Sequence, residues 1–331
     1  KEWEETLRLK PDSAYTAKRL AEARAALQTQ SAPTPRAPTQ PETHMPALLS
    51  NLTDEVAFRW RLPNEWVGIR FSFLPAKKGM EDVWYDAIRD SSGRMVPYAT
   101  YVGRICRVTA VDYKSLDKNG GVYYLSLRME DTGEQLTGNA YDLKDKGVTM
   151  MMCMAPTDEI ACAKKRFTGQ TLYYRMTWVT MEDPASGATA SFKVSRYSPL
   201  LITGVGPSTD SMMPIRLHVK TSSGRTGYVD TACSGTNTMA TAKQMDERSY
   251  PGLIDAQFID HDLHTEHPNW SSEVWDAIEK LKVVRGMSPE QAELAVSQPQ
   301  SKRSTENSER WDYGDGRFIH FLNGKVDTFS Y

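Results

Sequence analysis

The chain has 331 residues, enough for two or three domains, and its 40% hydrophobic and 25% charged residues are ordinary for globular proteins. The formal net charge is -2, so the composition gives no electrostatic case for nucleic-acid binding. No apolar run approaches the roughly 18 residues of a membrane helix, so we expect membrane association only through an anchor outside this sequence. Because the chain enters a helical pattern directly at Lys1, we interpret it as a fragment or a processed chain.

Residues 1–28 predict a helical segment. Trp3, Leu7 and Pro11 precede a stretch in which alanines recur on one helical face. This string resembles the end of a tetratricopeptide repeat array, and a plain amphipathic hairpin is the alternative. Residues 29–49 are rich in proline, which lacks the backbone N–H and disfavours helix before it, so they predict an extended linker.

Residues 50–245 consist of short alternating runs broken by glycine, asparagine and aspartate, which is typical of strands and turns. We predict strands at 66–73, 101–111, 122–129, 171–179 and 215–220, and a short helix from Asp158 to Lys165. Such spacing favours barrels or sandwiches, and helical periodicity is scarce.

A faint internal repeat runs through this β-rich region. The stretch 101–108 followed by 124–133 is similar to 197–205 followed by 215–224, and an aromatic strand precedes each half. We therefore predict two tandem β-barrel-like modules, over residues 50–150 and 151–245, with chance similarity between strands as the alternative. Gly227, Tyr228 and Val229 follow a turn, and in this respect residues 197–235 resemble bacterial Src-homology-type barrels. The resemblance implies binding of peptides or wall glycopeptides.

The aromatic residues of these modules are mostly expected in the core, and the best candidate for an exposed binding patch lies at Arg59, Trp60, Arg61 and Trp66. Its alternative is ordinary packing inside the barrel, because tryptophan is highly buried on average. We predict no catalytic residues: the stretch 230–235 lacks the Asp-Thr/Ser-Gly turn of aspartic proteases, and His218 on its strand is expected to be structural.

Three of the six histidines, His261, His264 and His267, are spaced by two residues among acidic neighbours in a polar connector, residues 246–267. Imidazoles bind zinc, so a metal-binding or sensory protein with a zinc cofactor is one hypothesis. A solvated connector without any cofactor is the expected alternative, since a metal site needs converging ligands. The cysteines Cys106, Cys153, Cys162 and Cys233 match no zinc pattern, and sequence leaves buried thiols and disulfides both open.

Residues 268–331 predict a C-terminal α+β module. A helix behind Ser271 is followed by a second one, for which Ser288, Pro289 and Gln291 form a capping box. Strands are expected at 310–313, 318–321 and 325–329, with a two-residue turn at Asn323 and Gly324 and a long polar loop at 300–309.

This order of elements resembles the SmpA/OmlA family of small outer-membrane lipoproteins, which have an ααβββ fold. One departure is Ser297-Gln298-Pro299, where the family usually has Gly-x-Pro. The resemblance implies protein and lipid binding and brings no catalytic residues. We therefore expect a mainly β, multidomain, non-catalytic binding or scaffold protein of the bacterial cell envelope, in the periplasm or at the outer membrane. Its expected partner is a protein or complex, with peptide or peptidoglycan also possible.

Overall fold

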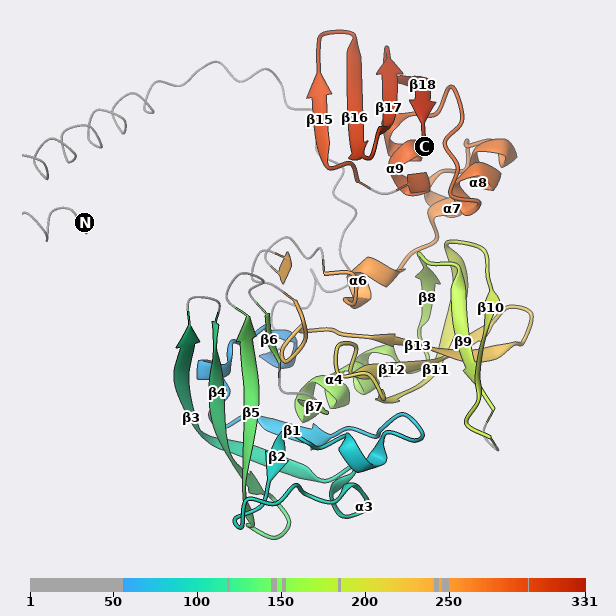
Figure 1. The fold of residues 1–331 in the computed structure, drawn as a ribbon. Coiled ribbons are helices and arrows are strands. Elements are labelled where there is room, and N and C mark those ends of the chain that lie inside the picture. Colours follow the sequence, from blue (N-terminus) through green and yellow to red (C-terminus); the bar gives the residue numbers. More distant parts are fainter. Residues whose placement is uncertain are drawn as a thin grey trace, which may run out of the picture. The chain divides into compact units, whose positions relative to one another are not determined.

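The computed structural model describes residues 56–117, 120–143, 148–150, 153–183, 186–240, 244–245, 250–296 and 298–331. The predicted helix at 1–28 and the linker at 29–49 lie outside the described residues. The described part is mainly β, as expected, and its strand ladders are antiparallel, with a sheet curled into a half-barrel (Figure 1).

The first sheet belongs to the N-terminal portion of the described chain. Its strands are β1 (Arg70–Phe73), β2 (Ile88–Arg89), β3 (Ile105–Asp117), β4 (Gly120–Met129), β5 (Gln135–Leu143), β6 (Val148–Met150) and β7 (Met154–Pro156). The strand order is β2-β5-β4-β3-β1-β7, and β6 pairs with β5. Short helices accompany it: η2 (Val56–Phe58), η3 (Pro63–Glu65), η4 (Glu81–Val83) and α3 (Tyr98–Tyr101). Side chains of β4 alternate between core and solvent, so that Leu125, Leu127 and Met129 are buried.

Helix α4 (Thr157–Phe167) follows β7 directly and precedes the second sheet. That sheet contains β8 (Thr171–Tyr174), β9 (Trp178–Glu182), β10 (Thr189–Lys193), β11 (Ser198–Pro207), β12 (Ile215–Thr221), β13 (Thr226–Thr231) and, after helix α6 (Ile254–Gln257), β14 (Phe258–Ile259). Its order is β10-β9-β13-β12-β11-β8-β14. Residues 246–267, predicted as a polar connector, thus contribute a strand, and the buried Phe258 pairs with Tyr174 of β8.

The two sheets share one pattern of strand pairing. In each, a three-strand meander (β3-β4-β5 or β11-β12-β13) is flanked by a strand that precedes it, β1 or β8. A short strand from after the meander, β7 or β14, pairs with that flanking strand on its other side. The last strand of each meander pairs with a strand from the segment that links the flanking strand to the meander. In the first sheet β5 pairs with β2, and in the second β13 pairs with β9. The strands that seemed similar in sequence therefore occupy equivalent positions in the two sheets.

The C-terminal part combines short helices with a four-stranded sheet. Its elements are α7 (Leu263–Glu266), α8 (Ser272–Glu279), α9 (Pro289–Val296), β15 (Ser301–Ser304), β16 (Ser308–Gly314), β17 (Arg317–Leu322) and β18 (Lys325–Ser330). The capping box is confirmed, because Gln291 N donates to Ser288 Oγ at 3.2 Å and Ser288 N donates to Gln291 Oε1 at 2.8 Å. Asn323 and Gly324 form the β17–β18 turn with φ of 50° and 72°, as a tight hairpin requires. The predicted loop 300–309 instead contains β15, so the sheet has four strands where three were expected.

The end of α9 is held by side chains from the second sheet. Arg196 lies between β10 and β11, is 6% exposed, and donates from Nη1 to Ala295 O at 2.8 Å and from Nε to Arg175 O at 2.7 Å. The Tyr197 hydroxyl donates to Leu294 O at 3.2 Å. These donors satisfy the last carbonyls of a helix, which have no partner within it, and a cation there suits the helix dipole. Burial lowers the pKa of Arg196 below its usual range.

All four cysteines are free thiols in this structure. Cys106, Cys153 and Cys233 are buried, and Cys162 on α4 is half-buried. Burial raises the pKa of Cys106 to about 12, which makes its thiolate scarce and its reactivity low.

Candidate functional site

The predicted patch at 59–66 does not form an exposed surface. Trp66 is fully buried, packs against Phe71 with ring centroids 5.2 Å apart, and donates from Nε1 to Arg61 O at 3.1 Å. Trp60 is half-buried against a small apolar cluster. Only Arg59 is exposed, and it pairs with Glu65 at 3.0 Å. Trp66 therefore belongs to the core of the first sheet, while Trp60 and Arg61 contact the segment that follows β13.

The three predicted metal ligands lie on and beside α7 without sharing a ligand position. His261 Nδ1 is 2.8 Å from Asp260 Oδ1, and His264 Nδ1 is 3.2 Å from Asp262 Oδ1. Two of the three rings also stack on tryptophans, His264 on Trp275 and His267 on Trp270, each with centroids 3.9 Å apart.

The two tryptophans also contact each other in a tilted arrangement, at 5.1 Å between ring centroids, so that four rings form one row of contacts. No group of three or more metal-ligating side chains converges within the part of the chain that the structure describes. The arrangement favours packing between α7 and α8 over zinc coordination.

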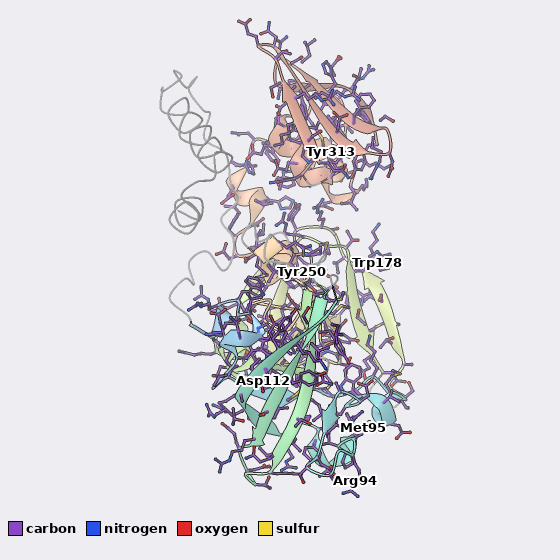
Figure 2. The ribbon with its side chains drawn as sticks, turned by 60° about the vertical axis from the view of Figure 1, so that its left-hand side comes forward. Arg94, Met95, Asp112, Trp178, Tyr250 and Tyr313 are labelled. Atoms are coloured by element: carbon purple, nitrogen blue, oxygen red, sulfur yellow. The ribbon has the colours of Figure 1, made fainter. Side chains whose placement is uncertain are left out.

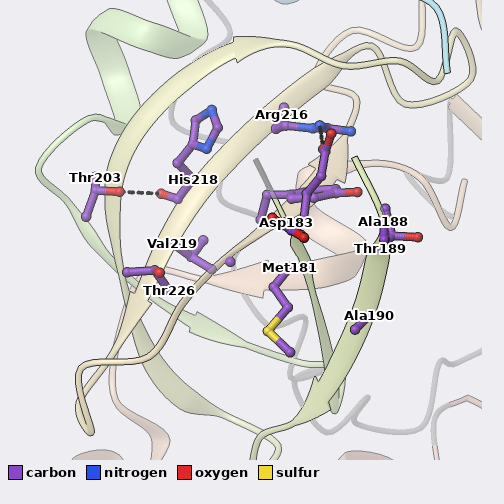
Figure 3. Close-up of a pocket in the computed structure, with 13 residues that line it drawn as sticks. Met181, Asp183, Ala188, Thr189, Ala190, Thr203, Arg216, His218, Val219 and Thr226 are labelled. Atoms are coloured by element: carbon purple, nitrogen blue, oxygen red, sulfur yellow. Dashed lines mark hydrogen bonds and ion pairs between the residues drawn. The ribbon is translucent and has the colours of Figure 1, made fainter. Parts of the chain in front are cut away.

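A pocket of about 720 Å³ lies on the second sheet. Figure 3 shows His218 and Thr203 on one side of it, Ala188, Thr189 and Ala190 of the β10 arm on the other, and Asp183 and Met181 between them. Its size falls within the roughly 300–1,000 Å³ of small-ligand sites. Alternation positions this lining: Arg216 and His218 are on the outer face of β12, while Leu217 and Val219 fill the core.

The Arg216 side chain is held in one orientation in the wall of the pocket. Its Nε and Nη2 bind the two carboxylate oxygens of Asp230 at 2.9 and 3.0 Å, and its Nη1 lies 3.2 Å from Glu182 Oε2. The guanidinium also covers the Tyr228 ring at 3.7 Å. A bidentate pair and a ring contact hold this long side chain in one orientation, so the pocket wall is preorganised.

The remaining lining is polar and carries acidic groups. Asp183 and Glu182 come from the end of β9, and Asp183 accepts from Ser186 Oγ at 2.6 Å. Threonines of β10, β11 and β13 contribute hydroxyls. Serine and cysteine are absent from the described residues of this lining, and the Thr203 hydroxyl donates to the backbone oxygen of His218 rather than to its ring. Such a lining can bind and orient a polar ligand.

A buried carboxylate, that of Glu159, joins α4 to the segment after β13. Glu159 is 1% exposed and accepts from Cys233 N and Ser234 N, both at 2.8 Å, and from Ser234 Oγ at 2.5 Å. Asn237 of the same segment donates to Met154 O of β7 at 2.6 Å. These contacts tie the first sheet and α4 to the loop that follows the pocket strand β13.

Burial raises the pKa of Glu159 above its ordinary value, against the lowering effect of its hydrogen bonds. Below the pKa of the unfolded state the group is protonated in both states and has no electrostatic cost. As pH rises through the raised pKa, the folded protein must hold a buried charge or a proton that the unfolded chain has lost. Stability therefore falls with rising pH in this window.

The pocket is not predicted from the sequence, because it forms only where two hairpins, β9–β10 and β12–β13, come together. The alternation of Arg216 and His218, with Tyr228 and Asp230 on the partner strand, was a visible signal of a polar outer face. The predicted strand 171–179 covers β8 and only the first two residues of β9, and no strand is predicted at β10, so the β9–β10 hairpin over this face is not expected from the sequence.

Comparisons with protein-family models, with curated proteins and with solved structures gave no match for this chain. Among the described residues, every helix is too short or too polar to cross a bilayer.

Proposed function

We propose that this chain is a non-catalytic binding or scaffold protein of the bacterial cell envelope, whose two β-modules present loops to a protein or wall ligand. The open pocket around the fixed Arg216 carries the proposal. It is preorganised, polar and large enough for a peptide or saccharide segment, and its donors are already ordered before a ligand arrives.

The shared pairing pattern of the two sheets supports two related barrels of the Src-homology type as the scaffold. In the second module the β9–β10 arm adds a wall that the first module does not have at β2, which has only two residues. This difference supports the second module as the one that binds the ligand. The C-terminal α+β part would then act as a docking module, fixed to the second sheet through Arg196.

The test uses a bulky residue placed inside the pocket. Ala190→Trp points a large ring into the space, while Ser191→Trp places the same ring on the opposite face of the same exposed strand, outside the lining. Purified full chain and variants are co-sedimented with peptidoglycan sacculi and, separately, titrated with soluble wall peptides. We expect the wild type and Ser191→Trp to bind and Ala190→Trp to lose binding. Equal binding by both variants, or none by the wild type, would contradict the proposal.

A further inference from the structure

A second, smaller pocket of about 210 Å³ lies where β10 ends beside the β12–β13 turn. Two cations, Lys193 and Arg225, and several serine hydroxyls line it, among them Ser198 and Ser223. Carboxylates are absent from the described residues of its lining. Its charge is therefore opposite to that of the larger pocket, to which Glu182 and Asp183 contribute.

Neither cation is neutralised by the protein. Within the described ranges, no ion pair joins Lys193 or Arg225 to a carboxylate. The Arg225 guanidinium lies 3.9 Å from the centre of the Phe192 ring, a contact that fixes its direction and leaves its N–H groups available. Two cations without a carboxylate partner beside one recess indicate a place for an anion.

The hydroxyl groups point to the same chemistry. Ser198 Oγ is enclosed by protein and has no hydrogen-bond partner. An enclosed hydroxyl without a partner is uncommon and costs stability, and rotation of the Ser198 side chain toward the pocket would let a bound acceptor satisfy it. The turn itself is rigid, because the Thr221 hydroxyl contacts Ser223 Oγ at 2.9 Å and accepts from Arg225 N at 3.0 Å.

We propose that this pocket binds a compact oxyanion of the phosphate or sulfate class, through Lys193, Arg225 and Ser198. A tetrahedral oxyanion offers acceptors in several directions, which suits an ammonium, a guanidinium and a hydroxyl that approach from different strands. The volume is below the usual range of sites for drug-sized ligands, which also favours a small group. The group would be free phosphate or a phosphate ester on a larger molecule. The site is separate from the one on which the proposed function rests.

Calorimetric titration of the full chain tests the site, with ionic strength held constant by chloride. One arm uses inorganic phosphate and the other glycerol phosphate, so the tighter ligand distinguishes a free anion from an ester. We expect saturable binding that Lys193→Gln and Arg225→Gln each weaken roughly tenfold, because a hydrogen bond to a charged group contributes about this factor. Ser198→Ala is expected to weaken it as well.

The control is Lys325→Gln on the exposed end of β18, which changes the net charge equally outside the lining. Unchanged circular dichroism melts show that the variants fold. Binding that does not saturate, or that all charge variants weaken equally, would overturn the proposal. Ala190→Trp in the larger pocket should leave phosphate binding intact, so the two sites fail or succeed separately.

Discussion

Replacing Arg196 by methionine should loosen the C-terminal part from the second sheet. The change removes the donors to Ala295 O and Arg175 O and keeps most of the apolar volume. Each bond from a charged donor contributes about 1.5–3 kcal/mol, and loss of the buried cation removes part of its desolvation cost. We therefore expect Arg196→Met to lower the free energy of opening of α9 by about 2–4 kcal/mol. Tyr197→Phe should lower it by about 1 kcal/mol.

Hydrogen exchange measures this directly. Amide protons of α9 should exchange about thirty to a thousand times faster in Arg196→Met, since each 1.4 kcal/mol changes an opening equilibrium tenfold. Arg166→Met, at an exposed arginine of α4, should change stability by less than about 0.5 kcal/mol. If α9 keeps its protection while the rest of the chain is destabilised, Arg196 does not hold the C-terminal part.

The strain at Tyr197 fits this role. Its φ of 60° lies in the left-handed region, which costs a non-glycine residue about 1–3 kcal/mol. The surrounding contacts, including the hydroxyl bond to Leu294 O, hold the residue there. The contact with the end of α9 thus offsets the backbone strain at Tyr197.

Three further predictions concern the predicted sites and the buried carboxylate. Glu159→Gln should flatten the decline of thermal stability as pH rises above the ordinary glutamate pKa of about 4.3, because the amide carries no charge to bury; an unchanged pH profile would show that Glu159 does not cause it. In urea unfolding, Trp66→Ala should lower the free energy of unfolding by about 3–5 kcal/mol, and Arg59→Ala should lower it by under about 1 kcal/mol. Equal effects would support the hypothesis of an exposed patch instead. Removal of metal by a chelator should leave the melting temperature unchanged, and a bound equivalent of zinc that His264→Ala releases would revive the metal hypothesis.

Local signals in the sequence were enough for several elements. The capping box at Ser288 and the turn at Asn323 depend on residues close in the chain, and both are present in the structure. The short helix predicted at 158–165 is confirmed as α4, with one residue more at its start and two at its end. Alternation likewise marked strands such as β12, because one face is buried and the other is open to solvent.

Long-range contacts explain what the sequence did not reveal. Strand β15 (Ser301–Ser304) is fully exposed and polar, so only its pairing with β16 makes it a strand. Trp66 and Trp178 both fall in predicted strands, 66–73 and 171–179, yet Trp66 caps the short helix η3 and is fully buried, while Trp178 begins β9 and is 59% exposed. Figure 2 shows Trp178 among the side chains at the edge of the second sheet. Which tryptophan is buried depends on the strands that cross it, and these come from distant parts of the chain.

Mapping a wall ligand onto the protein tests the central claim most directly. Chemical-shift perturbation of the labelled chain by soluble peptidoglycan fragments would locate the contact residue by residue. We predict that the shifts gather at Thr203, His218, Thr226 and Ala190 and saturate together. Saturating shifts confined to the first sheet or to the C-terminal part would contradict the assignment of ligand binding to the pocket around Arg216.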